Sequence, residues 1–175
     1  MNISELTLVQ TRLNCLISQS VTAVSRVADM LLVSFGDYEL RIQCYYRLTE
    51  NGAILLARND VYQPSEKMWE LWRAMGCEED CIPEDFRSDE PGANRMDECL
   101  ERLAGDLTGL TVQSALVNHL GDLTLCFATG ATLMVMTDTS GGEECWRLMN
   151  DASWTDDLVV YGDGAELQRA GDGME

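Results

Sequence analysis

Antiparallel β-structure is clearest in residues 30–48, which read MLLVSFGDYELRIQCYYRL. Strand-favouring side chains fill this stretch, and Gly36-Asp37 interrupts it with residues that favour a tight turn. Working outward, similar short runs precede and follow it, separated by turn residues at 28–29 and 51–52. The pattern predicts an antiparallel meander with strands at 21–27, 30–35, 39–46 and 53–58.

A second β region, from about residue 112 onward, resembles the first. Tyr45-Tyr46-Arg47-Leu48 matches Cys145-Trp146-Arg147-Leu148, and residues 30–35 match residues 121–127 in character. The matching segments keep the same order, with an insertion in the second copy around 137–144. We interpret this order as an internal duplication, although two unrelated meanders can share such a pattern by chance.

Helical spacing occurs before and between the β regions. Apolar residues recur from Ile3 to Ile17, and Asn2 with Glu5 has the spacing of a capping box. Two further helices are predicted at 64–75 and 93–104, each followed by a glycine. The predicted fold class is therefore α+β, with duplicated antiparallel β meander units, an N-terminal helix and a two-helix insert between the β regions.

The expected organisation is one compact domain, since 175 residues suffice for a single sizeable core. Glycine and few apolar side chains mark the last residues as a flexible tail. The expected parts are the N-terminal helix and first β unit at 1–62, the helical and acidic insert at 63–110, the second β unit at 111–165 and the tail at 166–175.

The chain is strongly acidic, with 30 Asp and Glu against 12 Lys and Arg, a net charge of −18 and a pI near 4.2. Residues 1–60 hold only six of the acids against five Arg, so the excess lies in the rest of the chain. A field of this sign repels nucleic acid and anionic lipid and favours encounter with basic surfaces. We expect a basic protein partner and no direct nucleic-acid binding.

Neither a signal peptide nor an apolar stretch long enough for a membrane span is apparent, so no membrane association is expected. The odd number of cysteines, without a signal peptide, indicates reduced thiols and a cytoplasmic protein. They lie at Cys15, Cys44, Cys77, Cys81, Cys99, Cys126 and Cys145.

No pattern of catalytic or metal-binding residues stands out. His119 is the only histidine and sits beside the turn residues Gly121-Asp122, while Cys77 and Cys81 lack a second pair of zinc ligands. Calcium loops, phosphate loops and nucleophile elbows are absent from the sequence. We therefore expect a non-enzyme with no catalytic residue, metal or cofactor, although a carboxylate pair stays open among so many acids.

Arg47 and Arg147 lie inside predicted strands, where a guanidinium is costly unless it is paired. Asp60 and Asp163 follow the next strand of each copy. The equivalent spacing predicts two structural ion pairs, Arg47 with Asp60 and Arg147 with Asp163. The alternative is an anion site built on the arginines.

An acidic run follows the first helix of the insert, and it is the surface feature that most suggests a partner. Such charge raises the rate of encounter with a basic protein, and tryptophans on the adjoining helix would supply an aromatic anchor. The alternative is a plain solvated loop. The candidate partner-binding residues are Glu78, Glu79, Asp80, Glu84, Asp85, Asp89, Glu90, Trp69 and Trp72.

Through residues 45–48 and 145–148 the chain resembles uncharacterised small bacterial proteins that carry repeated Trp-Arg-Leu strands, with Tyr46 replacing the tryptophan in the first copy. In size and charge it is similar to acidic immunity proteins of bacterial toxin systems. That similarity implies a non-enzymatic inhibitor that occludes a basic partner such as a toxin or nuclease. The alternatives are a small-molecule-binding or catalytic domain with a cleft between the β halves, and a subunit of a larger assembly of undetermined oligomeric state.

Overall fold

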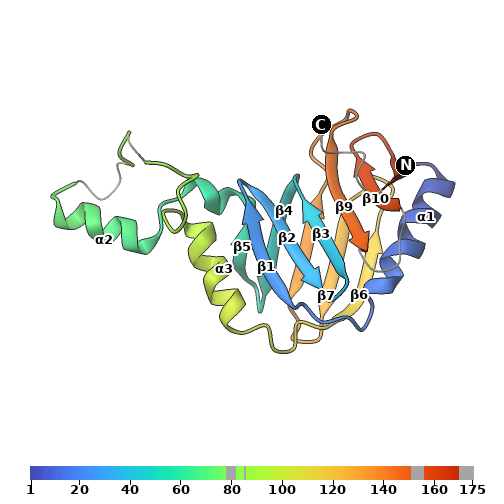
Figure 1. The fold of residues 1–175 in the computed structure, drawn as a ribbon, viewed down its shortest axis with the longest axis horizontal. Coiled ribbons are helices and arrows are strands. Elements are labelled where there is room, and N and C mark those ends of the chain that lie inside the picture. The colour runs from blue at the N-terminus through green and yellow to red at the C-terminus, as the bar shows by residue number, and fades with distance from the viewer. Residues whose placement is uncertain (78–81, 85, 151–155, 170–175) are drawn as a thin grey trace.

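The structure is a computed structural model that describes residues 1–77, 82–84, 86–150 and 156–169. This part of the chain has the predicted α+β fold, in which helices flank two antiparallel sheets that lie face to face (Figure 1). Its helices are α1 (Ile3–Leu13), α2 (Glu66–Ala74) and α3 (Arg95–Gly105), with short 3₁₀ turns η1 (Asn14–Leu16) and η2 (Arg58–Tyr62).

Eleven strands are present in the described residues, and they divide into a six-stranded and a five-stranded sheet. The first sheet has the order β1-β2-β3-β9-β10-β11, and the second has the order β5-β4-β8-β7-β6. The strands are β1 (Ala23–Val27), β2 (Met30–Phe35), β3 (Tyr38–Ile42), β4 (Tyr45–Glu50), β5 (Ala53–Ala57), β6 (Val112–Val117), β7 (Leu123–Phe127), β8 (Thr132–Met136), β9 (Glu144–Asn150), β10 (Asp156–Tyr161) and β11 (Ala165–Arg169).

The strand order gives the two β regions equivalent arrangements, and we call these regions the first and the second copy. In the first copy, the meander β1-β2-β3 lies in the first sheet and the hairpin β4-β5 lies in the second. In the second copy, the meander β6-β7-β8 lies in the second sheet, and β9-β10 lies in the first. The contacts β3–β9 and β8–β4 join the copies in equivalent ways. Each copy therefore completes the sheet that the other one begins.

Helices α1 and α3 also pack against strands of the other copy. α1, which begins the first copy, packs against β6 and β11, whereas α3, which precedes the second copy, packs against β1 and β5. The two helices thus lie at opposite ends of the sandwich, as Figure 1 shows. The capping box predicted for α1 is confirmed, because the Asn2 side chain accepts from the Glu5 amide at 3.0 Å and the Glu5 carboxylate accepts from the Asn2 amide at 2.8 Å.

Two predicted boundaries are wrong. The strand expected at 39–46 is two strands, because the chain passes from one sheet to the other at Gln43-Cys44, where both amides donate to the Cys145 carbonyl. The alternation of buried and exposed side chains does not show where the chain changes sheets, because every second residue stays buried across the break. These buried residues are Leu40, Ile42, Cys44 and Tyr46. The tail expected at 166–175 is wrong for residues 166–169, which belong to β11 and pair with β10, and residues 170–175 lie outside the described residues.

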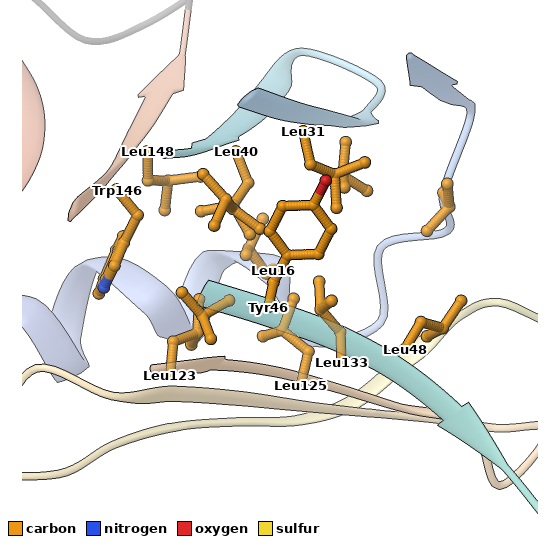
Figure 2. Close-up of a cluster of buried hydrophobic side chains, with 14 of the residues drawn as sticks. Leu16, Leu31, Leu40, Tyr46, Leu48, Leu123, Leu125, Leu133, Trp146 and Leu148 are labelled. Atoms are coloured by element: carbon orange, nitrogen blue, oxygen red, sulfur yellow. The ribbon is translucent and has the colours of Figure 1, made fainter. Parts of the chain in front are cut away.

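The core fills the space between the sheets. Figure 2 shows the Tyr46 ring between leucines of both sheets, with Leu31 and Leu40 on one side and Leu125 and Leu133 on the other. The indole of Trp146, the counterpart of Tyr46, is fully buried and donates to the Gly121 carbonyl at 2.9 Å. Burying a large apolar side chain contributes about 1.5–3 kcal/mol, so these aligned residues stabilise both copies.

Candidate functional site: an acidic arm

The insert between the copies contains an arm, which we define as residues 66–92. Figure 1 shows α2, the described helix of the arm, projecting past α3 and away from both sheets. The arm leaves and rejoins the body through a short antiparallel neck. The Ser65 amide donates to the Ala93 carbonyl at 2.9 Å, and the Arg95 amide donates to the Gln63 carbonyl at 2.7 Å. Both ends of the arm are therefore held together at its base.

Asp97, in the first turn of α3, ties this neck to the body. Its carboxylate accepts from the Gly92 amide at 2.7 Å and from the Asn94 side chain at 3.1 Å. Arg26 of β1 donates to the same carboxylate through two nitrogens, one of them at 2.7 Å. The hydrogen bond from Arg26 is the main reason why the pKa of Asp97 lies below its ordinary value.

Two small polar residues complete the base of the arm. Asn94 is fully buried, caps α3 by accepting from the Asp97 amide at 2.9 Å, and donates to the Ser88 carbonyl at 2.8 Å. Ser65, 2% exposed, caps α2 and donates to the Gly92 carbonyl at 3.1 Å. Because buried polar groups are costly unless satisfied, these bonds favour one orientation of the arm.

Within the arm, aromatic rings form a small cluster apart from the sandwich core. Trp72 is 5% exposed and contacts Trp69 and Phe86 edge to face, with ring centroids 5.3 Å and 5.9 Å away. Trp72 does not belong to the contiguous core cluster of the body. The helix is therefore packed against residues of its own arm, and its remaining surface faces outward.

That outward surface combines apolar side chains with acids. Leu71 and Met75, four residues apart on one face of α2, are 52% and 64% exposed, and Ile82 is 41% exposed. By sequence the arm holds nine acids and three basic residues. Two of those three basic residues form ion pairs inside the arm, Arg73 with Glu66 and Arg87 with Asp89. The arm therefore presents excess negative charge beside an apolar ridge.

The sequence-predicted partner-binding residues fall into three groups. Glu84, Asp89 and Glu90 are exposed on the arm. Trp69 is half-buried and Trp72 is buried, so Trp72 serves the packing of the arm and not its surface. The remaining predicted residues lie outside the part that the structure describes: Glu78, Glu79, Asp80 and Asp85.

Sequence reasoning missed the exposed ridge. Trp69 and Trp72 are the residues of this helix that the sequence singles out, and neither Leu71 nor Met75 is among them. The available signal was their spacing of four residues, which puts both on one face, a quarter turn from Trp72. Which face is buried depends on the position of Phe86, and no local pattern reports that.

The two predicted arginine pairs do not form. Arg147 instead binds Glu144 at 2.6 Å and Asp157 at 3.2 Å. The β9–β10 register pairs Arg147 with Val159, so Asp157, two residues from Val159, lies diagonally across on the same face, and Asp163 lies in the turn beyond β10. Asp60 accepts from the Ala57 amide and lies 3.7 Å from Arg95.

Arg47 is exposed, and none of the described carboxylates forms an ion pair with it. Its strand neighbours are Ala57 and Met134, and its guanidinium lies 4.0 Å from the Met134 sulfur. The two copies therefore share an arginine at the same strand position, but its side-chain partners differ.

The described residues leave a small cavity in the space between the sheets. The cavity there measures about 30 Å³ and is lined by apolar side chains such as Val33, Leu48 and Phe127. That volume corresponds to roughly one water molecule.

The described residues contain no group of three or more His, Cys, Asp or Glu side chains placed to hold a metal ion. Burial is the main cause that raises the pKa of the Cys44 and Cys145 thiols, which disfavours their thiolate forms. His119 is exposed in the turn between β6 and β7, and its carbonyl accepts from the N-terminal amine at 3.0 Å. No described helix is long and apolar enough to cross a bilayer.

Comparison of the chain with protein-family models, with curated proteins and with solved structures finds no match.

Proposed function

We propose that this protein is a non-enzymatic binding protein that occludes a basic protein partner, such as a toxin or nuclease, by means of its arm. The observation that carries the proposal is the projection of an acidic helical element with exposed Leu71 and Met75 from the sandwich. Exposed apolar side chains rimmed by charge are typical of interaction surfaces.

The two chemical components of the arm have different roles in this proposal. The acids steer a basic partner toward the arm and increase the association rate, an effect that salt screens. Leu71 and Met75 would lose their exposed area in the complex and slow its dissociation. The hydrogen-bonded neck holds both components in place before binding, which lowers the entropy lost on association.

The test begins with capture of partners from the native cells at low and high salt, followed by identification of what is retained. A basic protein bound at low salt and released at high salt is then purified, and its affinity is measured by calorimetry. The arm variant replaces Glu84, Asp89 and Glu90 with Lys. The matched control makes the same charge change at three exposed body acids, Asp37, Glu101 and Asp163.

We expect the arm variant to lose most of the binding and the body variant to lose little. A second variant, Leu71→Ser with Met75→Ser, should weaken binding by the same factor at every salt concentration at which binding is measurable, because its effect is not electrostatic. If the arm and body variants lose the same amount of affinity, the loss reflects the change in net charge alone, and a docking role for the arm is contradicted.

A further inference from the structure

The two copies differ at the outer edge of their last equivalent strand. In the second copy, β10 pairs with β9 on one side and with β11 on the other. Among the described strands, its counterpart β5 pairs with β4 alone and ends its sheet. The second copy therefore supplies from its own chain a strand that the first copy lacks.

A groove of about 240 Å³ lies between β5 and α3. Ile54 and Leu55 line it from the strand, and Cys99 and Leu103 line it from the helix. Ile54 is 59% exposed, although it lies beside the apolar side chains of the helix. The edge of β5 thus combines a terminal strand with an apolar hollow that takes side chains.

The walls of the groove also carry positive charge, in contrast to the chain as a whole. Arg95 and Arg102 both line it, with Asp106 at the end of the helix. The Arg102 guanidinium donates to the Cys99 sulfur at 3.2 Å and forms no ion pair with a described carboxylate. The Arg95 side chain is 59% exposed, and its ion pair with the Asp60 carboxylate is long, at 3.7 Å. These guanidinium groups favour an acidic ligand.

We propose that the groove between β5 and α3 binds an extended acidic peptide segment of a partner protein, which adds to β5 as a further antiparallel strand. The molecule itself displays this arrangement, since β11 adds to β10 beside α1. An edge strand offers unpaired backbone groups to such a segment. Alternate side chains of the bound strand would enter the groove, and its acids would meet Arg95 and Arg102.

The probe is a blocked peptide of alternating valine and glutamate, added to ¹⁵N-labelled protein at near-physiological salt. We expect amide shift changes in residues 53–57 and in α3, together with slower hydrogen exchange in β5. A peptide with lysine in place of glutamate should bind more weakly, against the preference set by the overall net charge.

Two substitutions test the details. Arg102→Glu should weaken binding about fivefold, the effect of losing one exposed ion pair, whereas Arg169→Glu, the same charge change on exposed β11, should leave it unchanged. Ile54→Pro should abolish strand addition, with circular dichroism as the check on folding.

Several outcomes would overturn the proposal. They are an absence of shifts in β5, equal binding of the lysine peptide, and concentration-dependent dimerisation through β5, which would assign the edge to a second copy of the chain. The arm variant of the previous subsection should bind this peptide as the wild type does. The groove and the arm can therefore fail independently.

Discussion

The sandwich body and the arm are held in place by different interactions. In the body, one contiguous apolar core runs through both sheets and contains Tyr46 and Trp146. The described residues of the arm form an aromatic cluster around Trp72, above a polar base centred on Asp97. An element with few buried apolar contacts opens at lower free energy than the core does. We therefore expect the arm to open locally at a lower free energy than the body, although the neck orients it while it is closed.

The largest contrast should come from removing one tryptophan in each region. Trp146→Ala creates a cavity in the body and leaves the Gly121 carbonyl without its donor, so we expect a loss of about 3–5 kcal/mol in unfolding free energy. Trp72→Ala should cost about 1 kcal/mol or less globally, because it empties only the arm cluster. Chemical denaturation measures both values.

Hydrogen exchange distinguishes local from global opening in the same pair of variants. In Trp72→Ala, amides of α2 should lose protection while those of β9 keep theirs. Comparable global losses in the two variants would mean that arm and body unfold together, and the distinction between them would be wrong.

Asp97→Asn tests the junction of arm and body. It removes a charge that pairs with Arg26, whose side chain is only 10% exposed, and we expect a loss of about 2–3 kcal/mol. Asn keeps the size of Asp97 and so the packing of α3, and the effect reports the loss of the charge together with the hydrogen bonds that one carboxylate oxygen accepts. Unfolding free energies of the two proteins near neutral pH measure it.

The difference in unfolding free energy between wild type and Asp97→Asn should depend on pH. The folded-state pKa of Asp97 is lowered from 3.8, so its contribution to stability is fully present above that value and is lost as the pH falls through the lower folded pKa. The difference between wild type and Asp97→Asn should therefore be constant from neutral pH to about pH 5 and shrink below pH 4. A difference that persists unchanged at low pH would exclude the charge as its source.

The smallest expected contrast in unfolding free energy comes from replacing the equivalent arginines of the two copies. Arg147→Met leaves Asp157, 4% exposed, without its ion pair, and we expect a loss of about 2 kcal/mol. Arg47→Met, the equivalent change in the first copy, should stay within about 0.5 kcal/mol, because Arg47 is exposed. Equal losses of unfolding free energy at the two positions would contradict the conclusion that Arg47 and Arg147 have different surroundings.

The amino-acid sequence by itself determined the elements of this protein. Side-chain period, turn residues such as Asn51-Gly52, and the Asn2–Glu5 capping box are local properties, and each acts through neighbours a few residues away. The alignment of Tyr46-Arg47-Leu48 with Trp146-Arg147-Leu148 also followed from sequence, since equivalent strands in the two copies must bury equivalent side chains.

Only the tertiary structure decided how those elements pair. Strands β3 and β4 keep one parity of buried residues, so nothing local shows that the chain changes sheets between them. The partner of Arg147 depends on the register of β9 against β10, and the exposure of Leu71 and Met75 depends on where Phe86 lies. Pairing, register and the covered side of a helix arise from contacts between residues distant in sequence, which local patterns do not encode.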